Sequence, residues 1–186
     1  MDKKLFEALK RIINPKDERE ALRGISYLDG SAYVSDSWAL VIVKTTYNDA
    51  YEGKIIDPQG VEINSRMIKF RDVFPESIFQ ELSDAERIPY SPEIKTACLN
   101  LSKIKDTPEY LKLNESVFNP GLLKKVLMVF EALKEVPEII PDPDRSRTRT
   151  YFKSEHCDAI IMEVVNHKNY QLVLSLEEAL TCGDLL

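Results

Sequence analysis

Apolar residues recur at helical spacing near the start of the chain. In residues 2–13 this stripe is formed by Leu5, Leu9, Ile12 and Ile13. The residue before a proline is forced out of the helical region, so Pro15 predicts that the helix ends at Asn14. We therefore expect an amphipathic helix whose basic residues lie off the apolar stripe.

A second helix is predicted after residue 118. Asn119 is a favourable cap and Pro120 a favourable first helical residue. The apolar face that follows comprises Leu122, Leu123, Val126, Leu127, Phe130 and Leu133. The helix should end by Val136, because Pro137 cannot continue it.

Short apolar stretches separated by turn residues predict strands between and after these helices. They lie at 22–28, 31–35, 38–45, 54–56, 61–63, 96–104, 110–113, 148–153, 158–165 and 170–174. The run Leu40-Val41-Ile42-Val43 indicates a strand buried on both faces. A short helix is expected at 76–82, an exposed proline-rich loop at 137–147 and a helical tail at 176–180.

Tight turns such as Asp29-Gly30 join successive strands as hairpins, which favours antiparallel sheet and an α+β class. A helix followed by about three strands occurs twice, near 2–56 and near 119–174. We expect one domain over 1–186, with halves at about 1–75 and 76–174 and a C-terminal tail at 175–186.

Composition limits the possible partners and locations. A net charge of −6 over 186 residues argues against coating of DNA by the whole surface, but it permits one basic face on an acidic body. No apolar run reaches the ~20 residues of a membrane span, and no signal sequence is evident, so we expect a cytoplasmic protein. Its 3 widely spaced cysteines fit reduced thiols.

Catalytic and cofactor motifs are not evident in the sequence. Its 6 glycines form neither a phosphate loop nor a dinucleotide fingerprint. His156 and Cys157 are adjacent, and adjacent side chains on a strand point to opposite faces, so they do not easily make a nucleophile and base. We predict no catalytic residue, no metal site and no cofactor. A small enzyme of unknown type is the least favoured function.

Several segments, in order, resemble a domain of the bacterial DNA polymerase III β subunit, the sliding clamp. They are Leu22-Arg23-Gly24-Ile25, Ser35-Asp36-Ser37-Trp38-Ala39-Leu40, Phe70-Arg71-Asp72-Val73-Phe74-Pro75, Phe118-Asn119-Pro120-Gly121-Leu122-Leu123 and Ala159-Ile160-Ile161-Met162-Glu163-Val164. Trp38 and Ala39 stand where clamps have His-Arg, and Glu163 stands where they have Pro.

The resemblance implies a DNA-clamp-like fold that encloses duplex DNA without catalysis, its helices facing the DNA. The implied phosphate contacts are Lys3, Lys4, Lys10 and Arg11 on the first helix and Lys124 and Lys125 on the second. Double-stranded DNA, a DNA polymerase or other replication protein, and further copies of the chain are the implied partners. One chain has room for one clamp domain, so a ring would be a homo-oligomer.

Alternative interpretations remain open. The fold could serve a protein–protein adaptor that does not bind DNA. Arg145, Arg147 and Arg149 could bind phosphate, although charges that guard an edge strand are favoured. Gln171-Leu172-Val173-Leu174 is similar to the Q-L-x-L peptide with which partners dock on clamps, but a strand explains it better.

Overall fold

The computed structural model describes residues 1–75, 77–104, 109–164 and 172–182. It is dominated by a seven-stranded sheet in the order β4-β1-β2-β3-β9-β8-β7. The strands in chain order are β1 (Ile25–Leu28), β2 (Ser31–Ser35), β3 (Ala39–Lys44), β4 (Lys54–Ile56), β7 (Glu138–Pro141), β8 (Arg149–Lys153) and β9 (Cys157–Met162). All neighbouring strands in this sheet are antiparallel.

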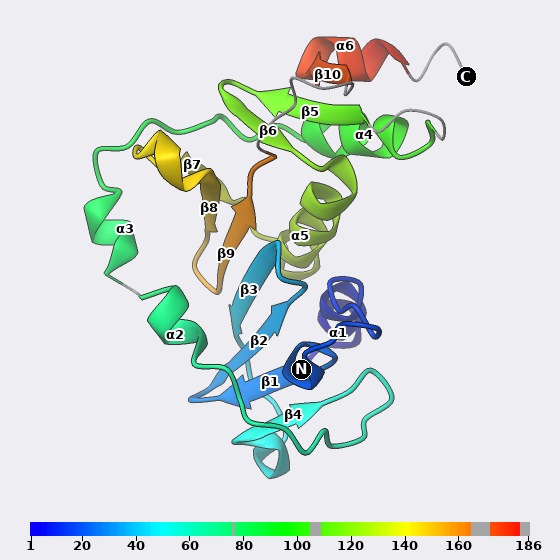
Figure 1. Ribbon diagram of the computed structural model, residues 1–186, viewed down its shortest axis with the longest axis vertical. Coiled ribbons are helices and arrows are strands. Elements are labelled where there is room, and N and C mark those ends of the chain that lie inside the picture. The colour runs from blue at the N-terminus through cyan, green and yellow to red at the C-terminus, as the bar shows by residue number, and fades with distance from the viewer. Residues whose placement is uncertain (76, 105–108, 165–171, 183–186) are drawn as a thin grey trace.

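The sheet is built from two similar halves, as expected. Helix α1 (Lys3–Lys10) precedes the meander β1-β2-β3, and helix α5 (Pro120–Leu133) precedes the meander β7-β8-β9. The last strands of the two meanders, β3 and β9, pair in the middle of the sheet, and α1 packs beside α5 on one face (Figure 1). The predicted α+β class with two helix-plus-strands halves is confirmed.

Local sequence explains where the two helices begin. The Asp2 side chain accepts hydrogen bonds from the amides of Lys4 and Leu5, and that of Asn119 accepts one from Leu122. These contacts satisfy amide groups that a helix start leaves unpaired. Helix α1 ends earlier than predicted, but Ile12 and Ile13 remain buried beyond it.

Both faces of the sheet are buried, because successive side chains of a strand point in opposite directions. In β3, Val41 and Val43 join the core beneath α1 and α5, whereas Leu40 and Ile42 join a second core on the other face. That second core is closed by the segment carrying α2 (Phe70–Val73) and α3 (Ile78–Glu81) (Figure 1). The prediction of a strand buried on both sides is confirmed.

A smaller layer lies at one end of the molecule (Figure 1). It contains β5 (Glu109–Leu113), β6 (Ser116–Phe118), β10 (Leu172–Ser175), α4 (Glu93–Leu101) and α6 (Leu176–Thr181). Strand β10 runs parallel to β5, and α4 packs against both α5 and α6. The strand expected near 170–174 and the helical tail are confirmed over Leu172–Thr181; residues 170, 171 and 183–186 lie outside the described residues.

Three sequence predictions are wrong. Residues 61–63 were expected as a strand, but they form only an isolated bridge between Glu62 and Ile56. Residues 96–104 were expected as a strand, but most of them belong to α4, where Ile94, Ala97, Cys98 and Leu101 are buried at helical spacing. The strand was predicted from the number of apolar residues within 96–104, and this missed the helical spacing of buried residues that begins before Thr96.

The segment 137–147 was expected as an exposed loop, yet it contains β7. Ile139 and Ile140 are buried on opposite faces of the sheet and secure this edge strand. Pro141 is tolerated at its end because an edge strand has one unpaired side. The edge is partly covered by a bridge from Ile88 to Ile139.

Candidate functional site

The basic residues of α1 lie on the outer side of that helix. Lys3, Lys4 and Arg11 are exposed, because the buried stripe of Leu5, Ala8 and Leu9 faces the core. Lys10 is half-buried: its Nζ is 3.2 Å from Oε1 of Glu7 and 5.3 Å from the centre of the Phe6 ring. Three of the four predicted residues on α1 are thus accessible to a phosphate backbone.

The two predicted lysines of α5 lie in different surroundings, because neighbouring residues on a helix differ in direction by about 100°. Lys124 lies on the side of α5 that faces α4, near Cys98. Burial raises the pKa of the Cys98 thiol to about 12, and the positive charge of Lys124 partly offsets that rise. Lys125 lines a hollow on another side, together with Trp38 and Tyr110. Both are half-buried, so α5 adds less accessible charge than α1.

A second surface, which the sequence did not reveal as a site, surrounds Trp38. Its side chain is 64 % exposed at the turn between β2 and β3. Trp38 and Met162 line two hollows, one of about 610 Å³ and a more apolar one of about 230 Å³. The smaller hollow has Leu22, Leu40, Ile68, Phe70 and Ile160 in its wall and Arg19 and Arg149 among its lining residues. A tryptophan before an apolar strand is ordinarily core, so sequence gave no sign of its exposure.

Polar contacts hold the turn that presents Trp38. Asp36 Oδ1 accepts hydrogen bonds from the amides of Trp38 and Ala39, at 3.1 and 2.9 Å. Ser37 adopts a positive φ of 80°, and its hydroxyl contacts the side chains of Asp17 and Arg19. The hydrogen bonds from Arg19 hold the pKa of the Asp17 carboxyl below its usual value. The turn is therefore fixed to the segment that precedes β1.

The arginines at the end of the proline-rich segment are engaged within the chain. Arg147 Nε is 3.1 Å from Oδ2 of Asp144, and Arg149 Nε is 2.7 Å from Oδ2 of the buried Asp142. The side chain of Arg145 is outside the described part of the structure. These ion pairs neutralise part of the positive charge with which Arg147 and Arg149 could bind phosphate.

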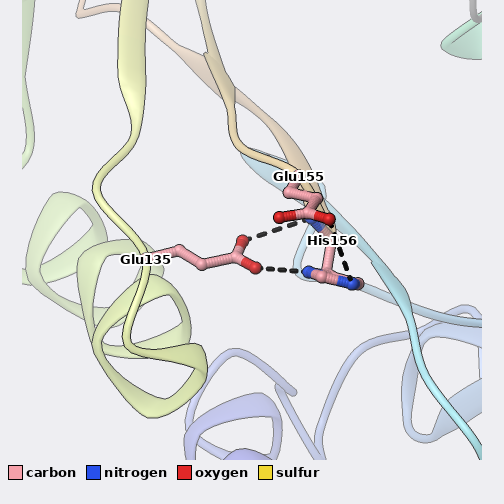
Figure 2. A group of neighbouring side chains, drawn as sticks. All are labelled: Glu135, Glu155 and His156. Carbon is pink, nitrogen blue, oxygen red and sulfur yellow. Dashed lines mark hydrogen bonds and ion pairs between the residues drawn. The ribbon is translucent and has the colours of Figure 1, made fainter.

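His156 belongs to a structural contact with Glu135 and Glu155 (Figure 2). Glu135 Oε1 lies 2.5 Å from Nδ1 of His156, and its Oε2 accepts hydrogen bonds from the Ser154 hydroxyl and the His156 amide. Both oxygens of Glu135 therefore already bind the turn between β8 and β9. Cys157 is buried, and burial raises the pKa of its thiol, so it is a poor nucleophile.

Solved structures of bacterial sliding clamps match this arrangement. The Helicobacter pylori beta clamp bound to a DNA ligase peptide aligns over 87 % of this chain with a TM-score of 0.62 at 9 % identity. The DNA polymerase III subunit beta of Pseudomonas aeruginosa aligns over 87 % with a TM-score of 0.58, also at 9 % identity. The chain has the fold of the bacterial sliding clamp.

This chain spans less than two thirds of the length of those proteins, since the match covers 62 % of the H. pylori chain and 65 % of the P. aeruginosa chain. No protein-family model matches the sequence, and no curated protein does either. At such low identity the likeness shows the fold alone. No helix in the described part of this clamp-like chain is sufficiently long and apolar to span a membrane.

Proposed function

We propose that this protein is a non-catalytic, clamp-like accessory of DNA replication in the cytoplasm, and that it binds duplex DNA through the outer face of α1. The observation that carries the proposal is the exposure of Lys3, Lys4 and Arg11 on a helix packed beside α5 in a clamp fold. Phosphate contacts of this kind do not depend on sequence and permit sliding.

Lys10, Lys124 and Lys125 remain part of the proposed interface with smaller roles, because each is half-buried. Enclosure of DNA would require several copies, because one chain spans 62 % of a single clamp chain such as that of H. pylori. A homo-oligomer is therefore part of the proposal.

The test measures molecular mass by light scattering and DNA affinity at two salt concentrations. The variant Lys3→Gln/Lys4→Gln/Arg11→Gln should lose at least 10-fold in affinity at low salt, and the slope of log affinity against log salt should fall by up to about 3. A control variant, Arg66→Gln/Lys69→Gln/Lys103→Gln, removes the same charge from other exposed positions and should retain most of the affinity.

Retention on circular but not linear DNA would support enclosure. Equal losses in the two triple variants would contradict a role for the α1 face. A monomer that is indifferent to DNA at low salt would refute DNA binding.

A second candidate function, a protein–protein adaptor, is favoured by the exposure of Trp38 beside an apolar hollow. The H. pylori clamp is bound to a DNA ligase peptide, and a polymerase or ligase segment is the corresponding partner proposed here. A synthetic peptide with the pattern Q-L-x-L should bind, and Trp38→Ala should weaken it at least 10-fold, whereas Leu99→Ala, at another exposed apolar residue, should not. Unchanged binding by Trp38→Ala would exclude this surface.

A further inference from the structure

The outer face of α1 carries an acidic residue among its basic ones. The charged side chains of the helix and its C-terminal cap are Lys3, Lys4, Glu7, Lys10 and Arg11. The carboxylate of Asp2, just before the helix, accepts hydrogen bonds from two backbone amides and belongs to the N-terminal cap. Glu7 is therefore the acidic side chain of the helix itself that a ligand of this face would meet.

Glu7 lies at the centre of the basic residues. Lys3 and Lys4, the first basic pair, precede it by four and three residues. Lys10 and Arg11, the second basic pair, follow it by three and four residues, and Arg11 keeps helical backbone angles. Residues three and four apart are neighbours on a helix surface. At about 100° per residue, Glu7 points between the two members of each pair.

The acid holds one of the four cations. Nζ of Lys10 lies 3.2 Å from Oε1 of Glu7, one turn away along the helix. The side chain of Glu7 is 52 % exposed, so the carboxylate remains accessible while it makes this contact. Among the residues that the structure describes, no ion pair is found for Lys3, Lys4 or Arg11. Three cations are thus available to a ligand, and the fourth is shared with the acid.

The two basic pairs are separated along the helix by about the width of a DNA groove. Corresponding members of the pairs are seven residues apart. At a rise of 1.5 Å per residue, this separation is about 10 Å. The major groove of B-DNA is about 12 Å wide. The long side chains of each pair can therefore reach the phosphates of a different strand, with Glu7 over the groove between them.

We propose that Glu7 makes the α1 face selective for duplex DNA over single-stranded DNA, with the two basic pairs on opposite backbones and the carboxylate over the groove. A single strand that runs from one pair to the other carries its phosphates past Glu7, where like charges repel. A duplex places its phosphates on either side of the groove and avoids most of that repulsion. The inference rests on the DNA binding proposed for α1 and assigns its specificity.

The experiment measures the affinity of the full chain for a duplex and for an oligothymidylate of equal length, by fluorescence anisotropy at low salt. The wild type should prefer the duplex. Glu7→Gln removes the central negative charge and should raise the affinity for oligothymidylate by about 5-fold or more. It should raise the affinity for the duplex by less than about 2-fold, because few phosphates lie near Glu7 in that complex.

Two further variants separate the position of the charge from its mere presence. Glu115→Gln is the matched control: Oε2 of Glu115 lies 3.6 Å from Nζ of Lys112, three residues away, but in the turn between β5 and β6. It should change both affinities little and alike. Glu7→Asp keeps the charge on a shorter side chain and should keep the preference for duplex.

Paired substitutions test whether both ends of the helix contact DNA. Lys3→Gln/Lys4→Gln and Lys10→Gln/Arg11→Gln should each lower duplex affinity at least 3-fold, because each removes the contacts with one backbone. A loss confined to one of these two variants would overturn the arrangement with Glu7 over the groove.

Equal gains of Glu7→Gln for the two DNAs, or no gain for oligothymidylate, would overturn the inference while DNA binding by the wild type stands. A wild type that binds neither DNA would overturn the proposed function and this inference with it. Because Glu7 is exposed, the unfolding temperature of Glu7→Gln should match that of the wild type, which separates a change in affinity from a change in fold.

Discussion

The carboxylate of Glu135 lies 2.5 Å from Nδ1 of His156 and joins the end of α5 to the turn between β8 and β9 (Figure 2). The carbonyl of His156 also accepts a hydrogen bond from the amide of Lys44, at the end of β3. The pair therefore links the helix of one half with the central strand of the other.

This link should make stability depend on pH. The hydrogen bond with Glu135 raises the pKa of His156, with added attraction from Glu135 and Glu155 and opposition from Lys44. Burial alone would raise the pKa of Glu135, but the combined hydrogen bonds from Ser154 and His156 lower it. The contribution of His156 to stability is complete below its usual pKa of 6.5, and it is lost as the pH rises through the raised pKa of the folded state. The contribution of Glu135 to stability is complete above its usual pKa of 4.5, and it is lost as the pH falls through the lowered pKa of the folded state.

We therefore expect wild type to exceed His156→Gln in stability most clearly between pH 4.5 and 6.5, with the difference shrinking toward pH 8. Urea denaturation across this range measures it. A difference in the free energy of unfolding between wild type and His156→Gln that stays constant over pH would contradict the role of the charged pair.

The two lysines of α5 should contribute little to the affinity for duplex DNA. Lys125→Gln should change that affinity by less than about 3-fold, because Lys125 is half-buried beside Trp38. Lys124→Gln should also change it little, since Lys124 lies on the α4 side of α5. Fluorescence anisotropy with labelled duplex DNA compares both with the α1 variant. A loss from Lys124→Gln as large as that of the α1 triple variant would show that α5 dominates the interface.

The packing of the segment with α2 and α3 against the sheet should depend on Phe74. Phe74 is 1 % exposed, and its ring lies 5.8 Å from Tyr151 and 5.4 Å from Phe79, measured between ring centres. Phe74→Ala leaves a cavity and should cost about 3–5 kcal/mol of the free energy of unfolding. Urea denaturation tests this. Phe79→Ala, at a partly buried ring on the same segment, should cost less.

The docking of α6 should depend on Asn100. This buried side chain donates from Nδ2 to the carbonyls of Ala179 and Leu180, each at 3.2 Å, and so closes the end of α6 against α4. Asn100→Ala leaves those carbonyls without this donor and should cost about 1–2 kcal/mol. Hydrogen exchange should accelerate in α6 more than in β3 or β9. Thr96→Ala, at an exposed position of α4, is the control and should leave that exchange unchanged.

The sequence by itself determined the two principal helices, most strands and the repeated helix-plus-strands plan. These follow from local causes: caps at Asp2 and Asn119, the 3.6-residue period of α5, and the run of apolar residues in β3. The sequence also indicated the clamp fold, because several short segments resemble those of a clamp domain and occur in the same order.

Only the tertiary structure decided that β7 is a strand, that α4 is a helix covering α5, and that Trp38 is exposed beside two hollows. Each depends on partners distant in sequence: β8 and Ile88 for β7, α5 and α6 for α4, and the Asp17–Arg19 contact with Ser37 for the Trp38 turn. Local propensity carries no information about such contacts, because burial is a property of the assembled chain. For the same reason, the sequence could not show that Lys124 and Lys125, which are adjacent in the chain, have different surroundings in the fold.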